Sequence, residues 1–230
     1  MRRLFTLVIA VPILIAVFAA PAMGATGESR FASTQAGVLA TAFWDSCTPD
    51  TPGPGLQTCS FVNVHVFDGK TRFSEGGGQP AIAGSLACVS LFSAVVTDEG
   101  EFVEPLSDES GCDENLDEGA LTVADDLSSI TLSTTIAVDE FVCDEVSCEP
   151  VVEPRDVEVD VTWTAVSEPV SFRERNVSHS SVDGMQCTSM FSGSGERAEA
   201  TATGTVDDVA LGEVGAEISR GRQSISQHCQ

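Results

Sequence analysis

The hexapeptide Cys88-Val89-Ser90-Leu91-Phe92-Ser93 returns later in the chain as Cys187-Thr188-Ser189-Met190-Phe191-Ser192. The match extends outward without a gap, so that residues 72–93 lie over residues 171–192 with six of the 22 positions identical. Similarity at a fixed offset indicates an internal repeat, which constrains a fold before any single motif does. We therefore expect a fold built from an internal duplication.

Weaker matches continue the repeat on its N-terminal side. Residues 37–47 lie over 133–143, each segment ending in cysteine, and residues 62–67 lie over 157–162. These matches predict two pseudo-repeats, 37–132 and 133–230. The last strand ends in Cys229 and resembles the strand that ends in Cys47. A chain that starts and ends with the same type of strand can close one sheet on itself.

Hydrophobic residues recur with the period of a β-strand. Valine occupies every second position in 62–66 and again in 157–161, which is typical of half-buried antiparallel strands. No helical period of useful length occurs, although 207–213 would allow a short helical turn. The stretch 106–119 contains six acidic residues and no apolar run, so we expect a surface loop there.

These patterns predict an all-β protein, a disulfide-stabilised antiparallel β-sandwich of about ten strands, with residues 37–230 forming a single domain. The alternative is two tandem sandwiches of immunoglobulin size. The join between the repeats at 130–142 is itself strand-like and has no Pro/Gly/Ser linker. A single domain is therefore the expected arrangement.

The N-terminus has the features of a secretory signal peptide. Arg2 and Arg3 precede the apolar stretch 4–20, and small residues suited to cleavage follow it. We expect a signal peptide at 1–25, a flexible lead-in at 26–36, and a secreted, extracellular protein. A retained membrane anchor is the alternative, but the apolar stretch is barely long enough to span a bilayer. The mature chain is expected to have no membrane attachment.

All eight cysteines lie after this segment, and an even number in a secreted chain predicts four disulfides. Equivalent positions in the two repeats should pair equivalently. The expected bonds are Cys47–Cys59, Cys143–Cys148, Cys88–Cys112 and Cys187–Cys229. Cross-links between the halves, such as Cys88–Cys187, are the alternative that a closed sandwich would permit. Zinc is not expected, because no closely spaced ligand pairs occur.

The chain is strongly acidic, with a net charge of −24. Without Arg2 and Arg3, nine basic residues face 35 acidic ones, and the net charge becomes −26. Such a field repels nucleic acid and anionic lipid surfaces. It favours solubility, cation binding or a basic partner, and a merely solvated surface is the ordinary interpretation.

No catalytic signature is present. The three histidines, His65, His179 and His228, lie far apart in the sequence, and no nucleophile elbow, zinc-protease motif or phosphate loop occurs. If every cysteine is oxidised, no thiolate remains. We expect a non-enzymatic protein without a cofactor, and the alternative is a secreted hydrolase with an unrecognised carboxylate site.

One acidic segment resembles the start of a calcium-binding loop. Residues 113–119 alternate oxygen-bearing side chains before a glycine, although the glycine comes one residue late and no closing glutamate follows. The candidate calcium ligands are Asp113, Asn115, Asp117 and Asp125. An ordinary acidic loop is the alternative interpretation.

The only basic cluster evident in the sequence is Arg173, Arg175 and His179. It would bind a carboxylate or a sulfated glycan, or else form salt bridges with the acidic surface, which is the more usual role of such a cluster. The aromatic residues Trp44, Trp163, Phe92 and Phe191 are expected in the core. Together these features predict an extracellular binding or surface-interaction protein whose partner is an extracellular protein or glycan. A structural or cation-binding surface protein is a further alternative.

Overall fold

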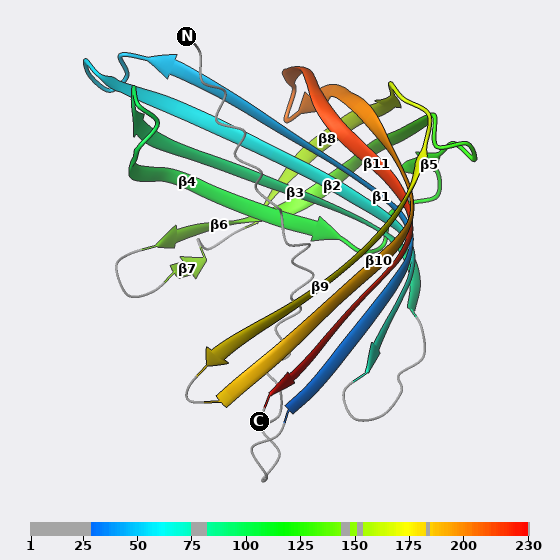
Figure 1. The fold of residues 1–230 in the computed structure, drawn as a ribbon. Coiled ribbons are helices and arrows are strands. Elements are labelled where there is room, and N and C mark those ends of the chain that lie inside the picture. Colours follow the sequence, from blue (N-terminus) through cyan, green and yellow to red (C-terminus); the bar gives the residue numbers. More distant parts are fainter. Residues whose placement is uncertain (1–28, 75–81, 144–147, 151–153, 183–184, 230) are drawn as a thin grey trace.

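The computed structural model describes residues 29–74, 82–143, 148–150, 154–182 and 185–229, and these residues form eleven strands and no helix (Figure 1). The strands are β1 (Ser29–Pro49), β2 (Leu56–Ser74), β3 (Ile82–Thr97), β4 (Phe102–Asp113), β5 (Leu121–Val123), β6 (Ser129–Cys143), β7 (Cys148–Pro150), β8 (Arg155–Ala165), β9 (Val170–Val182), β10 (Met185–Val206) and β11 (Val209–Cys229). Every pairing between them is antiparallel. The prediction of an all-β antiparallel fold is confirmed.

Eight of the strands close into a ring. The order runs β11-β1-β2-β3-β4-β6-β8-β10, and β10 pairs in turn with β11. The expected sandwich of two separate sheets is not what forms, because hydrogen bonding continues from each strand to the next. Closure comes from the first and last strands, which pair from Ser29 opposite Cys229 to Ala42 opposite Ala216. A closed ring leaves few unpaired strand edges.

The core fills the inside of the ring. Along β8, Val157, Val159, Val161 and Trp163 are fully buried, while the residues between them are exposed or half-buried. Similar stripes on β1, β2, β3, β6, β10 and β11 complete one apolar cluster. Burial of each such valine or isoleucine contributes about 1.5–3 kcal/mol. Trp44 is also buried, so the prediction of a core position is confirmed for both tryptophans. The same prediction was wrong for Phe92 and Phe191, which are only half-buried and lie outside the core cluster, because they project from the other face of the sheet.

A row of glycines crosses five neighbouring strands at the edge of this core. Gly37 of β1 lies opposite both Gly69 of β2 and Gly221 of β11. The row continues to Gly84 of β3 on one side and Gly195 of β10 on the other. A Cβ atom at Gly37, Gly69, Gly195 or Gly221 would collide with a carbonyl oxygen of the adjacent strand. Only glycine permits these backbones to approach so closely.

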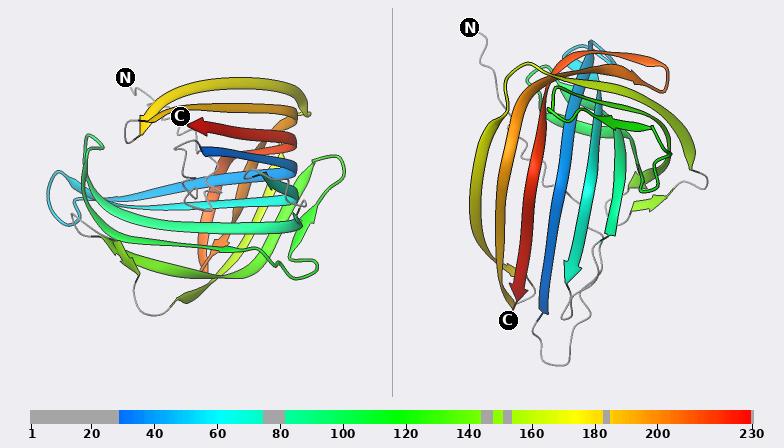
Figure 2. Two further views of the ribbon diagram at one scale, coloured as in Figure 1. Left: turned by 90° about the horizontal axis from the view of Figure 1, so that it is seen from below. Right: turned by 90° about the vertical axis from the view of Figure 1, so that its right-hand side faces the viewer.

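The sheet continues past this glycine row as an extension. Figure 1 shows β1, β10 and β11 converging at one side of the molecule and then running on beside β9, and Figure 2 shows the same strands as one curved layer. The extension consists of residues 29–36, 70–74, 170–182, 185–194 and 222–229. Among the side chains described in these ranges, Cys187 is the one buried hydrophobic residue, and it lies outside the main apolar cluster. The described part of the extension is therefore held mainly by its hydrogen-bond ladders.

Three local expectations were wrong. Residues 29–36, expected as a flexible lead-in, belong to β1 because they pair with β2 and β11 on both sides. Much of the expected acidic loop is strand β4, whose charged side chains point mostly to solvent. The region 207–213 is not helical. Asp207 and Asp208 have positive φ angles of 54° and 62° and form the tight turn of the β10–β11 hairpin.

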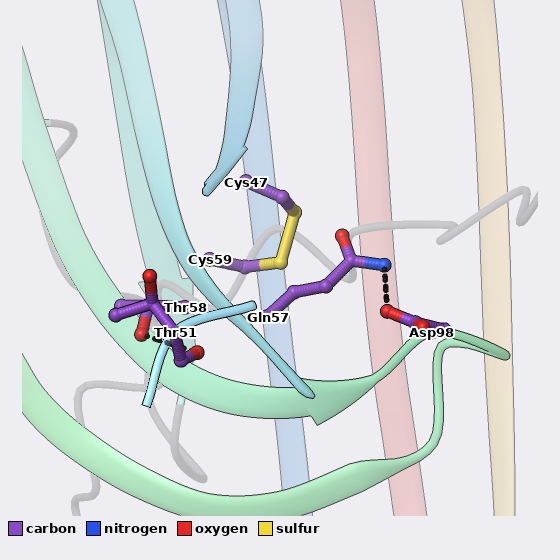
Figure 3. The surroundings of a disulfide bond; sticks show 6 residues. All are labelled: Cys47, Thr51, Gln57, Thr58, Cys59 and Asp98. Atoms are coloured by element: carbon purple, nitrogen blue, oxygen red, sulfur yellow. Dashed lines mark hydrogen bonds between the residues drawn. A yellow bond between two sulfur atoms is a disulfide. The ribbon is translucent and has the colours of Figure 1, made fainter. Parts of the chain in front are cut away.

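The disulfides join cysteines that lie directly opposite each other on adjacent strands. Cys47–Cys59 (Figure 3) and Cys88–Cys112 are formed, with Cα–Cα distances of 4.0 and 4.1 Å, and both predictions are confirmed. The backbones of Cys143 and Cys148 are also opposite each other, as are those of Cys187 and Cys229. Cys187 is itself disulfide-bonded. Both remaining predicted bonds fit this register.

Alanine substitutions in the glycine row should destabilise the protein more at the crowded positions than at the open position, Gly84. We expect Gly37→Ala or Gly195→Ala to lower the free energy of unfolding by about 1–3 kcal/mol, because the new methyl group meets backbone. Gly84→Ala is the matched control, since nothing lies within 4 Å of the added atom. Urea unfolding of the oxidised protein measures the difference. Equal effects at Gly84 and Gly37 would contradict the crowding.

Non-reducing peptide mapping should recover all four predicted disulfide pairs, including Cys143–Cys148 and Cys187–Cys229. The reason is that each pair is directly opposed on neighbouring strands, where the Cα separation suits a disulfide. A peptide joining Cys88 to Cys187, or Cys47 to Cys143, is incompatible with the strand order.

Candidate functional site

The histidines do not form a catalytic group. His65 lies on β2 within the ring, whereas His179 and His228 lie on β9 and β11 of the extension. His179 Nδ1 is 3.1 Å from the hydroxyl oxygen of Thr188, and Thr188 is opposite His228 on its other side. These two histidines therefore share one face of the sheet with a strand between them, and neither lies beside His65.

The predicted calcium ligands are only partly brought together. Asp113, Asn115 and Asp117 line a surface pocket of about 570 Å³ with Glu158 and Asp160. The carboxylate of Asp113 accepts a hydrogen bond from the backbone N–H of Asn115 at 2.8 Å. Asp125 does not line the pocket, and its carbonyl oxygen accepts a hydrogen bond from Arg220 at 2.7 Å. Across the described residues, no group of three or more His, Cys, Asp or Glu side chains is placed to hold a metal ion.

The basic cluster is larger than its sequence suggests. Arg173, Arg175 and His179 alternate along β9, so their side chains emerge on one face of the sheet. Lys70 and Arg72 on β2 alternate in the same way. Arg222 on β11 lies between them, and the register places all six on the same face.

Two rows define this basic face. In the first row, Arg173 lies opposite Ser194, which is opposite Arg222, followed by Ala36 and Lys70. The second row consists of Arg175, Ser192, Ser224, Thr34 and Arg72. Directly opposed residues share a face, so each row begins and ends with a cation. Across five strands the rows span about 19 Å, and they lie about 7 Å apart.

The basic residues of this face are accessible, and none of them forms an ion pair with a carboxylate of the described residues. Lys70, Arg72, Arg173, Arg175, His179 and Arg222 are all exposed. Arg175 contacts the sulfur atom of Met190 at 3.7 Å, and the hydroxyls of Ser192 and Ser224 are hydrogen-bonded at 2.8 Å. In the described part of the chain the ion pairs involve Arg155, which binds Glu109 and Asp207. The expected internal salt bridges of Arg173 and Arg175 are therefore not observed there.

Among the described residues, the acidic side chains that border the basic face lie next to the glycine row. Glu196 lies opposite Arg220, and Asp68 lies opposite Val38, both on the side where the extension joins the ring. The Asp68 carboxylate accepts a hydrogen bond from Ser85 at 2.7 Å. Glu174 sits between Arg173 and Arg175 in the sequence. Because successive side chains point to opposite faces, Glu174 lies on a different face of the sheet from Arg173 and Arg175.

The sequence revealed only half of this basic face. The pair Lys70 and Arg72 shows the same alternation as Arg173 and Arg175, which is a usable signal for a shared face. Nothing local indicates that β2 and β9 belong to the same stretch of sheet, about 100 residues apart in the chain. The register of the intervening strands β10, β11 and β1 supplies that information.

No family model, curated protein or solved structure matches this chain. Among the residues that the structure describes, there is no helix of the length and apolar character needed to cross a membrane. The interpretation of the basic face therefore rests on its own chemistry.

Calcium binding at residues 113–117 stays a prediction. If the loop binds calcium, millimolar calcium should give a heat of binding in titration calorimetry and should raise the melting temperature, because the ion binds only the folded loop. Asp113→Asn combined with Asp117→Asn should abolish both effects, while Glu213→Gln should change neither. Absence of both heat and thermal stabilisation in the unsubstituted protein would dispose of the site.

Proposed function

We propose that this protein is a secreted, non-enzymatic binding protein whose basic face binds a carboxylated or sulfated polysaccharide outside the cell. One observation carries the proposal. In a chain of net charge −24, six basic side chains share one exposed face, and the described residues provide them with no carboxylate partner. Their unpaired charges favour an anionic ligand.

The ligand class follows from the spacing and type of the side chains. Arginine binds carboxylate and sulfate groups in a bidentate manner, and five of the six basic residues are Arg or Lys. Serine and threonine hydroxyls lie between the cations in both rows, where they can bond to sugar hydroxyls. A sheet face about 19 Å across suits several units of an extended chain, whose weak contacts add up.

Nucleic acid is a poorer fit for this face. Neither row contains an aromatic side chain on which a base could stack. The acidic ring also adjoins the basic face, and a long phosphate backbone crossing the glycine row would meet Glu196 and Asp68. A polysaccharide of lower charge density avoids much of this repulsion.

The compartment is consistent with this proposal. Disulfide bonds such as Cys47–Cys59 form and persist in oxidising surroundings, which include the extracellular space. The predicted signal peptide, residues 1–25, lies outside the described residues. Secretion remains part of the proposal.

We also infer that the ring arose by duplication of a four-strand unit. The strand order supports this, since β1, β2, β3 and β4 are followed around the ring by β6, β8, β10 and β11. The aligned segments 37–47 and 133–143 fall on β1 and β6, and the aligned cysteines Cys88 and Cys187 fall on β3 and β10. Both cysteines are buried, and Phe92 and Phe191 are both half-buried.

Binding to heparin and to polygalacturonate tests the proposed function, with neutral dextran as the control polysaccharide. We expect Arg173→Ser, Arg175→Ser and Arg222→Ser together to weaken binding about tenfold or more, because three charge contacts are lost. The corresponding triple lysine variant keeps the charge and should retain most of the affinity. Binding should also weaken as salt is added.

Two outcomes would contradict the proposal. One is equal binding of dextran and the anionic polysaccharides. The other is binding that the triple serine variant leaves unchanged while its melting temperature matches that of the unsubstituted protein.

A further inference from the structure

A row of phenylalanines crosses the opposite face of the sheet, on the outside of the ring. Phe43, Phe61, Phe92 and Phe102 come from β1, β2, β3 and β4 in turn. Their rings are stacked with successive centroid separations of 6.0, 5.8 and 6.4 Å and interplanar angles of 14–25°. We call these four residues the phenylalanine row.

The phenylalanine row is exposed to solvent at both ends. Phe43 is 45% exposed and Phe102 is 60% exposed, while the two central rings are half-buried. Single exposed apolar residues need no explanation, but four aromatic rings in contact form a continuous apolar strip. Strips of this kind commonly mark a binding surface.

Carboxylates flank the phenylalanine row on the same face. Asp45 of β1 lies directly opposite Phe61, and Asp108 of β4 lies directly opposite Phe92. Since Phe61 and Phe92 also face each other, the four strands present an aspartate, two phenylalanines and a second aspartate in one line. Asp45 and Asp108 are both exposed, so the negative charge is accessible beside the rings.

No lysine or arginine occurs in the parts of the four strands that carry this strip, which are residues 38–49, 56–68, 85–97 and 102–113. His65 lies on the same face, and burial lowers its pKa below the ordinary value, which disfavours its charged form. The strip is therefore uniformly acidic and aromatic, in contrast to the basic face of the extension.

We propose that the phenylalanine row, with Asp45 and Asp108, is a binding site for the arginine and lysine side chains of a basic polypeptide. The two exposed end rings, Phe43 and Phe102, would attract these cations through the negative face of the ring, and arginine is the cation found there most often. The two aspartates bind the same groups by ion pairing. The aliphatic stems of the basic side chains cover the ring edges.

Other occupants fit the charges less well. An anionic lipid surface or polysaccharide would be repelled by Asp45 and Asp108. A neutral apolar partner would have to desolvate both carboxylates without compensation. A second copy of this chain, docking its own basic face, is distinguished by the experiment below.

The test is titration of the oxidised protein with a ten-residue oligoarginine peptide, beside a Gly/Ser peptide of the same length. We expect Phe43→Leu with Phe102→Leu to weaken oligoarginine binding about five- to thirtyfold, because leucine keeps the apolar character but lacks the quadrupole. Asp45→Asn with Asp108→Asn should weaken it similarly. Glu118→Gln with Glu213→Gln removes the same charge elsewhere and is the matched control.

Three outcomes would overturn the proposal. The first is an equal loss of affinity in the Glu118/Glu213 control, which would assign binding to net charge alone. The second is unchanged affinity in the leucine variant at an unchanged melting temperature. The third is failure of oligoarginine to bind while sedimentation shows self-association that the Asp45/Asp108 variant removes. Retained binding of oligoarginine by the basic-face serine variant keeps this site distinct from the proposed polysaccharide site.

Discussion

The close contact of backbones along the glycine row is the constraint on which the rest of the structure depends. At Gly37, Gly69, Gly195 and Gly221 the neighbouring strand's carbonyl oxygen occupies the space that a Cβ would need. The strands can therefore turn sharply together while their ladders continue in register. On one side of the row the sheet closes around an apolar core, and on the other side it runs on as the extension.

This continuity explains how one sheet presents two faces of opposite charge. Side-chain alternation carries unchanged through the glycine row, so the basic face lies on the same side of the sheet as the core. The phenylalanine row lies on the other side. Within the ring, this side of the sheet is packed with valine, alanine and isoleucine side chains. In the extension the same side is exposed and carries arginine and lysine. The protein is acidic overall, and its extension nevertheless provides a separate basic surface.

Much of this structure was predictable where the signal is local. The alternation in 157–163 predicted a half-buried strand, and the positions of Cys47, Cys59, Cys88 and Cys112 within the repeats predicted both observed disulfides. Ring closure was foreseen as a possibility from the similar first and last strands, yet the sandwich interpretation was preferred. Closure depends on which distant strands share hydrogen bonds, and a two-residue period does not encode partner choice. The acidic composition of 106–113 favours a loop, yet these residues belong to β4. The reason is that charged side chains are tolerated in a strand that faces water.

The full basic face was not predictable for the same reason. Arg173 and Arg175 were recognised as a cluster, but Lys70, Arg72 and Arg222 join them only through the register of five strands. The glycines of this row are scattered over the 185 positions from Gly37 to Gly221, and no local motif connects them. Their alignment becomes apparent only when the strands are paired.

The most direct test of this account is the set of inter-strand proton NOEs across the glycine row in the oxidised protein. Opposed residues in antiparallel strands alternate between close pairs, whose α-protons are in contact, and hydrogen-bonded pairs, whose amide protons are in contact. The observed register predicts α-proton contacts from Gly37 to Gly69 and from Gly221 to Gly195, and an amide-proton contact from Gly37 to Gly221. Contacts displaced by one residue, or no amide-proton contact between β1 and β11, would contradict both the closed ring and the shared basic face.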